Sequence, residues 1–210
     1  NITYPPEFIF TPTLENFQAV FQQHNFFRYL MNSLIIATLA TGLSLVLGLP
    51  AAYSIAKYRQ GRIGMIILLA RMTPFVSYLL PWYIIFRYLK LIDTYTALTL
   101  THLIITLPMV AWLMVAFFES VPAELEDAAM IDGCSRLKSF LIIVLPLVRN
   151  GIATSAIMAF IFSWNQFLFS LILSGPQTKT VPVAVYNFIS YGKIDWAGIG
   201  AAATLIVLPV

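Results

Sequence analysis

The chain has 210 residues, of which 60% are hydrophobic and 10% are charged, and its mean hydropathy is +0.84. An ordinary soluble domain is about 45–50% apolar and about 25% charged, so these proportions exclude a water-soluble domain and favour a bilayer protein. The net charge of +3 comes from scattered basic residues, which excludes a nucleic-acid-binding stripe. The single cysteine, Cys134, excludes an internal disulfide, and two distant histidines, His24 and His102, argue against a metal site.

The first residues predict no targeting segment. The chain begins with Asn1 instead of Met, and residues 1–6 lack the basic and apolar regions of a signal peptide. We therefore expect the native start to be missing.

Four long apolar stretches predict membrane-spanning helices. Each exceeds the roughly 20 residues that a helix needs to cross the hydrocarbon core, and Arg71 is the only charged residue within them. The stretches are about 29–56, 63–86, 95–118 and 150–173. A fifth run at 197–210 is too short for a full crossing. The predicted fold is all-α: a polytopic transmembrane helical bundle that forms one domain over residues 1–210.

The basic residues between the first two stretches indicate the orientation. Lys57, Arg59 and Arg62 lie close together in a short connection, and such clusters favour the cytoplasmic side. The loop at 119–149 is then also cytoplasmic. Prolines at positions 50, 74, 81 and 108 lie within the stretches and predict kinked helices.

A short helix is predicted at residues 122–133 in this loop. Pro122 suits a first helical turn, and the acidic residues after it interact favourably with the positive N-terminal end of the helix dipole. Gly133 can adopt the left-handed conformation that ends a helix. Residues 139–148 form an apolar run too short to span, so they lie at the interface or begin the next helix. A solvated linker helix is the alternative interpretation.

This loop resembles the Glu-Ala-Ala loop of permease subunits in binding-protein-dependent ABC importers. Asp127, Ala128 and Ala129 are followed at the same spacing by Gly133 and by Ile-Val-Leu-Pro at 143–146, and the one departure is Asp127 in place of Glu. The resemblance implies that the helix at 122–133 is a coupling helix that docks on a cytoplasmic ATPase. The implied coupling residues are Glu124, Glu126, Asp127, Ala128, Ala129, Asp132 and Gly133.

Other segments resemble carbohydrate-type permeases related to the smaller membrane subunit of the maltose importer. They are residues 13–17, 32–34, 51–54, 81–83 and 164–167. That family has six spans with both ends cytoplasmic, so the chain would lack the first span and the end of the last. The resemblance implies one subunit of an ATP-driven sugar importer in a bacterial or archaeal cytoplasmic membrane. Its partners would be a second permease subunit, an ABC ATPase dimer and an extracytoplasmic sugar-binding protein.

The chain has no phosphate-binding Gly-x-x-x-x-Gly-Lys-Ser/Thr string. We therefore expect no enzyme activity and no cofactor in this chain, with ATP and Mg bound by the partner ATPase. A non-sugar solute is one alternative. An ion-coupled secondary transporter is another, which the lack of Asp and Glu within the spans disfavours.

Several polar residues are candidates for the substrate path. Arg71 lies within a span, where a charge usually faces a cavity or a partner, although it could also pair with the second permease or extend toward the headgroups. Trp164, Asn165 and Gln166 combine an aromatic ring with amides, which suits sugar binding, but such amides also bond neighbouring helices. The same ambiguity applies to Asn32, Thr73 and Ser77.

The loop at 179–195 is a candidate contact with the binding protein. Its candidate residues are Tyr186, Asn187 and Tyr191. A plain extracytoplasmic loop is the competing interpretation.

Overall fold

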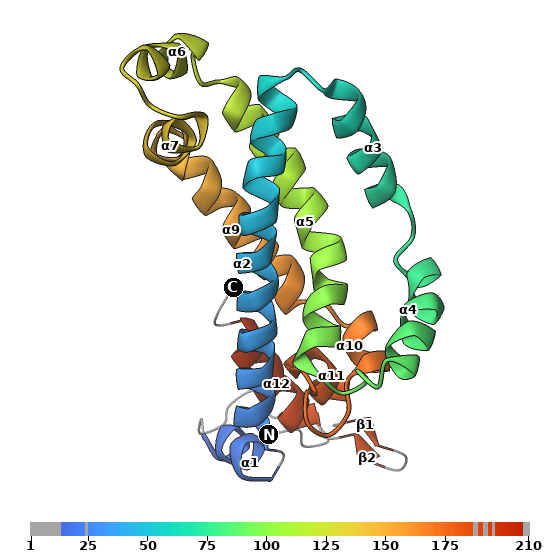
Figure 1. Cartoon of the computed structure of the whole chain (residues 1–210). Helices are drawn as coiled ribbons and strands as arrows, with labels where there is room; N and C mark the ends of the chain where they lie inside the picture. Colours follow the sequence, from blue (N-terminus) through green and yellow to red (C-terminus); the bar gives the residue numbers. More distant parts are fainter. Residues whose placement is uncertain (1–13, 24, 187–188, 191–192, 195, 208–210) are drawn as a thin grey trace.

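The computed structural model describes residues 14–23, 25–186, 189–190, 193–194 and 196–207. In these residues the fold is a helical bundle with one short hairpin (Figure 1), which confirms the predicted fold class. The elements are α1 (Glu15–Gln23), α2 (Phe26–Lys57), α3 (Gly61–Met72), α4 (Val76–Tyr88), α5 (Tyr95–Glu119), α6 (Ala123–Ile131), α7 (Arg136–Ser139), the π-helical turn η1 (Phe140–Val144), α8 (Leu145–Leu147), α9 (Arg149–Trp164), α10 (Leu168–Leu173), α11 (Val181–Tyr186), β1 (Ile189–Ser190), β2 (Lys193–Ile194) and α12 (Trp196–Val207).

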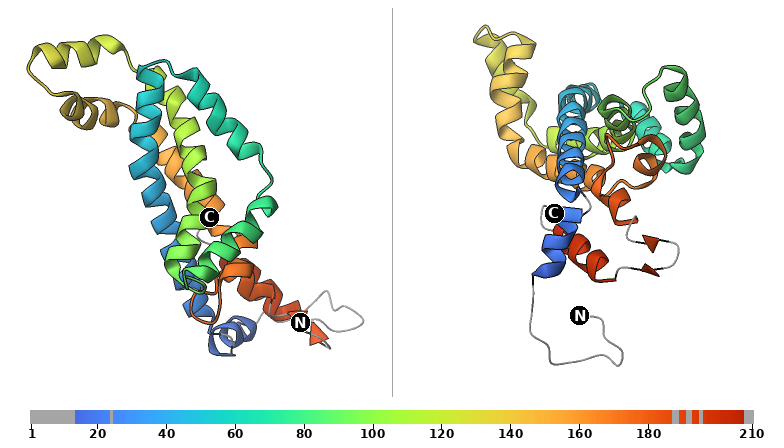
Figure 2. Two further views of the ribbon diagram at one scale, coloured as in Figure 1. Left: turned by 45° about the vertical axis from the view of Figure 1, so that its right-hand side comes forward. Right: turned by 90° about the horizontal axis from the view of Figure 1, so that it is seen from below.

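The helices α2 and α5 run side by side through the centre of the bundle, and α9 packs against both (Figures 1 and 2). The helices α2 and α5 have 32 and 25 residues and are strongly apolar, so at about 1.5 Å per residue each can cross the hydrocarbon core. Ser44 and Thr106 share a hydrogen bond of 2.6 Å between the two helices. The helices approach closely at Gly48, where an added Cβ would lie 3.0 Å from Val110.

The segment predicted as a span at 63–86 is divided into two helices. The axes of α3 and α4 differ by 87°, and the two helices form the arch beside α5 in Figure 1. Thr73 is extended, with φ −67° and ψ 127°, because the ring of Pro74 disfavours the helical conformation of the residue before it. By contrast, Pro50, Pro81 and Pro108 remain inside helices. One of the four prolines therefore breaks a helix where we had expected kinks.

The segment predicted as a span at 150–173 corresponds to α9 and α10, with a break at residues 165–167. The apolar run at 139–148 is helical over most of its length, and the helical stretch Arg136–Leu147 meets α9 at an angle of 79°. By length and composition, the described residues contain two helices that can cross a membrane, or up to four if each bent pair forms one span.

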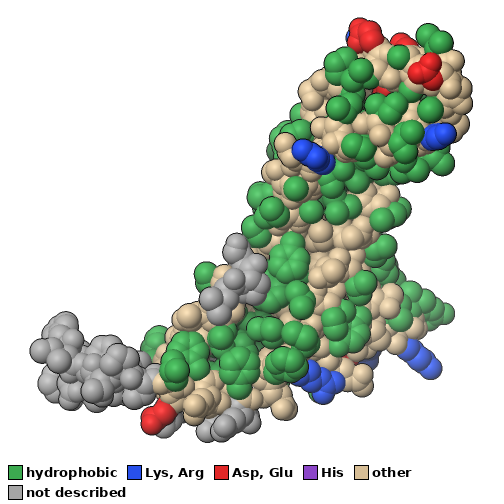
Figure 3. Space-filling model, turned by 90° about the vertical axis from the view of Figure 1, so that its left-hand side faces the viewer, with side chains coloured by type: hydrophobic (Ala, Val, Ile, Leu, Met, Phe, Trp, Pro, Cys, Tyr) green, Lys and Arg blue, Asp and Glu red, His purple; other side chains and the backbone are tan. Residues whose placement is uncertain are grey.

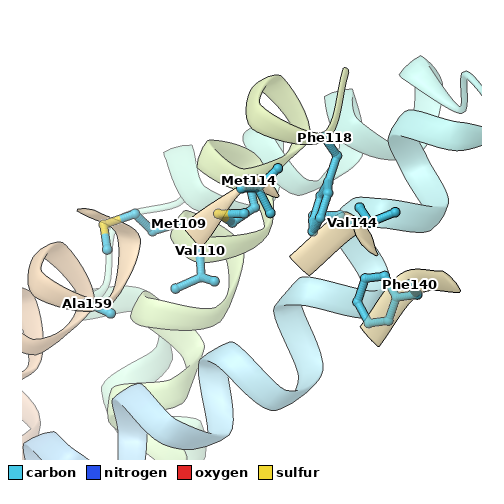
Figure 4. Close-up of a cluster of buried hydrophobic side chains, with 9 residues drawn as sticks. Met109, Val110, Met114, Phe118, Phe140, Val144 and Ala159 are labelled. Carbon is cyan, nitrogen blue, oxygen red and sulfur yellow. The ribbon is translucent and has the colours of Figure 1, made fainter. Parts of the chain in front are cut away.

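Three clusters of buried apolar side chains hold the bundle together. The first joins α2, α5, η1 and α9, and Figure 4 shows part of it, with Phe118, Phe140 and Val144 close together. The second joins the opposite end of α5 to α4 and α10 and is centred on Phe86 and Phe169. The third packs α12 against α1, α2 and α11.

Many large apolar side chains point outward from these clusters. Examples are Ile66, Leu80 and Ile157, each of which is 60–66% exposed. In water such a surface would be costly, whereas hydrocarbon is a favourable solvent for it. The outward surface thus agrees with a bilayer environment.

The predicted run at 197–210 forms α12 over residues 196–207. Its small residues Gly198, Ala201 and Ala202 are buried, and the helix lies against α1 and α11. The indole nitrogen of Trp164 donates a hydrogen bond of 3.1 Å to the carbonyl oxygen of Ile206. This bond connects α12 to the end of α9.

Candidate coupling surface and translocation path

The short helix predicted in the 119–149 loop is α6, at one end of the bundle (Figure 1). We call this end the α6 end and the opposite end the α11 end. Pro122 precedes the first turn, which carries acidic residues near the helix N-terminus. Gly133 has φ +86°, as expected, and its N–H donates to Met130 while the N–H of Cys134 donates to Ala129. This pair of bonds is a Schellman motif, which satisfies carbonyls at the helix end.

The seven predicted coupling residues lie on two sides of α6. Glu126 and Ala129 are buried, whereas the other five are exposed. The exposed residues are Glu124, Asp127, Ala128, Asp132 and Gly133. Figure 3 shows acidic side chains gathered at the α6 end of the face that it displays. The exposed side of α6 therefore carries acidic residues and the small residue Ala128, together with the exposed apolar side chains of Leu125 and Ile131.

Glu126 binds the membrane helix α2. Its carboxylate accepts a hydrogen bond of 2.5 Å from the Tyr53 hydroxyl and forms a salt bridge with the Lys57 ammonium. The Lys57 nitrogen also lies 5.7 Å from the centre of the Tyr53 ring. From the sequence we expect Glu126 among the docking residues and assign no contact with α6 to Tyr53 or Lys57. Their spacing of four residues places both on one face of α2, but nothing local connects that face to a carboxylate 69 residues away.

The Tyr53 ring also belongs to an aromatic cluster below α6. Its centre lies 5.7 Å from that of Phe118 in α5 and 4.8 Å from that of Phe140 in η1. Phe118 and Phe140 lie 6.1 Å apart. Beside the cluster, a cavity of about 820 Å³ separates part of α6 from α3, and Lys57, Arg59 and Asp127 contribute to its lining.

Asn32 lies near the start of α2, at the α11 end. Its side-chain amide donates to the carbonyls of Gln177 at 3.0 Å and Lys179 at 2.9 Å, and its carbonyl accepts from the Tyr95 hydroxyl at 2.6 Å. The neighbouring Ser33 hydroxyl accepts from the Val181 N–H at 2.9 Å. Both donor hydrogens of the Asn32 amide are thus used to hold the loop after α10.

Asp93 holds the same loop from the turn before α5. Its carboxylate accepts hydrogen bonds from the N–H groups of Gly175, Gln177 and Thr178 and from the Thr178 hydroxyl, at 2.7–3.1 Å. Partial burial alone would raise the pKa of Asp93, but the bonds from Thr178, Gln177 and Gly175 outweigh it and hold the pKa below its usual value. We predicted no role for Asp93 from the sequence, because its partners lie more than 80 residues away.

The candidates Arg71, Thr73 and Ser77 gather at the break between α3 and α4. The Arg71 guanidinium lies 5.9 Å from the centre of the Phe162 ring in α9, at the distance of a cation–π contact. Thr73 is half-buried and Ser77 is exposed. The break therefore carries one charge, which faces α9, and two hydroxyl groups close to it in the chain.

The candidates Trp164, Asn165 and Gln166 lie where α9 ends. Trp164 is buried and bonded to α12. The Asn165 amide donates to the carbonyl of Ile161 at 2.9 Å, and the Gln166 side-chain oxygen accepts from the N–H of Leu168 at 3.1 Å. Both amides therefore bond the backbone of the broken helix, where we had weighed sugar contacts against bonds between helices.

His102 in α5 is a further polar residue at this break. Its two ring nitrogens lie 2.8 Å from the Ser163 hydroxyl and 3.3 Å from the Ser170 hydroxyl, which belong to α9 and α10. His102 thus joins the helices on both sides of residues 165–167. From the sequence, His102 is considered only as a metal ligand.

Of the predicted contacts with a binding protein, Tyr186 is exposed at the end of α11, and its ring centre lies 6.5 Å from that of Phe167. Asn187 and Tyr191 lie outside the described residues.

Residues 44–210 match the model of the family described as "Binding-protein-dependent transport system inner membrane component". The chain belongs to this family. The helical bundle and the loop that matches the Glu-Ala-Ala pattern agree with that assignment, which excludes an ion-coupled secondary transporter. The chain is thus a permease of an ABC transport system and an inner-membrane component.

Relatives and a solved structure cover most of the chain. It is 36% identical over 204 residues to a sulfoquinovosyl glycerol transport system permease protein of Agrobacterium fabrum, which covers 95% of this chain and 71% of the relative. It is 34% identical over 206 residues to a trehalose transport system permease protein of Mycobacterium tuberculosis, and this alignment covers 95% of this chain and 75% of the relative. The crystal structure of a bacterial ABC transporter involved in the import of alginate contains a similar chain, with a TM-score of 0.76 and 22% identity. The match covers 92% of this chain and 74% of that chain.

Proposed function

We propose that this permease imports a sugar or a sugar derivative, driven by ATP hydrolysis in a partner ATPase dimer that docks on α6. The exposed side of α6 carries the proposal: it presents Asp127 and Ala128 outward on a helix that ends in the Schellman motif at Gly133 and is fixed to the bundle through Glu126. A small residue permits close approach of another protein, and the acidic residues favour a basic partner surface.

The proposed complex has four further components. A second permease forms the translocation path with this chain, two ATPase subunits bind ATP and Mg, and an extracytoplasmic sugar-binding protein delivers the solute. The complex lies in a bacterial or archaeal cytoplasmic membrane, with the α6 end toward the cytoplasm. The basic cluster after α2 supports this orientation, and the named substrates of the two relatives support a sugar.

The experiment is affinity purification of a tagged full-length permease, with identification of the co-purifying ATPase and binding protein and then of the ligand of the latter. Recovery of an ATPase and a sugar-loaded binding protein supports the proposal. Reproducible recovery of no ATPase contradicts the docking, and a binding protein loaded with a different class of solute contradicts the sugar assignment.

A charge reversal localises the docking surface. Asp127→Lys should reduce ATPase recovery at least roughly tenfold, equal to about 1.4 kcal/mol, because it places a like charge against a basic partner. Glu15→Lys is the matched control, since Glu15 is also exposed but belongs to α1 at the α11 end. Equal ATPase recovery by the two variants would exclude this side of α6 as the docking surface.

A further inference from the structure

The helix α2 is bound at both ends to segments that lie outside the central bundle. At one end Tyr53 and Lys57 bind Glu126 of α6. At the other end Asn32 and Ser33 bind the backbone of residues 177–181. The two attachment points are about 20 residues apart along one helix, or about 30 Å at 1.5 Å per residue.

At the α6 end the side-chain attachment is the main polar connection between α6 and the membrane helices in the described part of the chain. The backbone of α6 packs against α7 and η1, and a cavity lies on the side facing α3. Glu126 and Lys57 are largely withdrawn from solvent, with side-chain exposures of 10% and 20%. Charge-assisted hydrogen bonds between such partners are stronger than neutral ones.

The Tyr53 ring is fixed independently of its hydroxyl. Phe118 and Phe140 hold the ring from two different elements, so the hydroxyl has little freedom to leave Glu126. A carboxylate held by a fixed hydroxyl and an ammonium has a defined position relative to the axis of α2.

We propose that Tyr53 and Lys57 are positioning residues that lock α6 to α2 through Glu126, so that a displacement of α6 is passed along α2 to the segment at 177–181. This lock explains why one residue of an acidic helix is turned inward while its neighbours face outward. Its role in transport rests on the proposed function, but the lock itself can be measured without a partner.

The first measurement is hydrogen–deuterium exchange of the full-length permease in lipid nanodiscs. Tyr53→Phe keeps the ring and removes only the hydroxyl, and Glu126→Gln removes the charge. Each should speed exchange in α6 roughly tenfold, because each removes a charge-assisted bond. The matched control is Tyr58→Phe, since the Tyr58 hydroxyl accepts an exposed bond from Arg136 at 2.6 Å and does not touch Glu126. Unchanged exchange in α6 for Tyr53→Phe and Glu126→Gln overturns the lock.

The second measurement is the amount of ATP hydrolysed per molecule of solute imported by the reconstituted complex. The lock variants should retain the ATPase and still raise this ratio several-fold, whereas Tyr58→Phe should leave it unchanged. The double exchange Lys57→Glu with Glu126→Lys should restore the ratio, because it rebuilds the ion pair in reverse. Faster exchange in α6 with an unchanged ratio overturns the transmission.

The two proposals fail differently. If the wild-type permease recovers no ATPase, the proposed function is wrong, and the exchange data still decide whether the lock exists. If the ATPase is recovered and exchange in α6 is insensitive to Glu126, the lock is wrong and the proposed function stands.

Discussion

The end of α6 offers a test in which only the backbone conformation matters. Gly133 has φ +86°, and an added Cβ would meet no atom within 4 Å. A substitution there is therefore strained by its dihedral angles and not by crowding. The left-handed region costs about 1–2 kcal/mol for an ordinary L-residue, and a β-branched residue is less tolerated still.

We expect Gly133→Val to break the two bonds of the helix end, from Gly133 to Met130 at 3.1 Å and from Cys134 to Ala129 at 2.9 Å. The exposed side of α6 then loses its fixed direction, and solute uptake should fall at least tenfold, corresponding to about 1.4 kcal/mol. Gly133→Asn is the matched control, because asparagine tolerates the left-handed conformation.

The assay is uptake of the identified solute by reconstituted complexes, together with co-purification of the ATPase. Valine should impair uptake and asparagine should nearly preserve it. Normal uptake and normal ATPase recovery with Gly133→Val would refute both the importance of the helix stop and the coupling role of α6.

Two further predictions concern packing and pH. Gly151→Ala should destabilise the bundle by about 1–2 kcal/mol in thermal unfolding, because the added Cβ would lie 2.4–2.7 Å from the Phe117 ring and this overpacking outweighs the roughly 1 kcal/mol gain in helix propensity. The control Gly42→Ala, whose added Cβ has nothing within 4 Å, should stabilise the bundle. Equal effects of the two variants on thermal unfolding would contradict the packing at Gly151. The pKa of Asp93 in the folded protein lies below its ordinary value of 3.8. The stability that its hydrogen bonds provide is therefore fully present above about pH 4 and is lost as the pH falls through the pKa of the folded state. The protection of residues 175–181 against hydrogen exchange, measured relative to the intrinsic exchange rate at each pH, should therefore fall on acidification in the wild type and depend less on pH in Asp93→Asn. An identical pH dependence of the protection in the two proteins would contradict the assignment.

The features that the sequence predicted are those determined by neighbouring residues. The start and end of α6 depend on Pro122 and Gly133, whose backbone preferences act within one helical turn. Two apolar stretches long enough to cross the bilayer, at 29–56 and 95–118, correspond to α2 and α5. These features required no knowledge of what packs against them.

The inward turn of Glu126 could not be predicted in this way. Glu126 and Asp127 are adjacent acidic residues, and only the partner surface decides which one faces inward. That surface is supplied by Tyr53 and Lys57, which are far from α6 in the sequence. The same holds for Asp93, whose four bonds go to a loop that lies beyond α9 and α10.

The polar candidates for the substrate path illustrate a further physical limit. Each break in a membrane helix leaves backbone N–H and C=O groups without partners, and hydrocarbon supplies none. A polar side chain close to a break therefore serves the backbone first, as Asn165 and Gln166 do. Position within an apolar stretch does not distinguish this role from ligand binding. Because the guanidinium of Arg71 lies over the Phe162 ring and has no described bond to its own helix end, the break between α3 and α4 is the better place to begin a search for solute contacts.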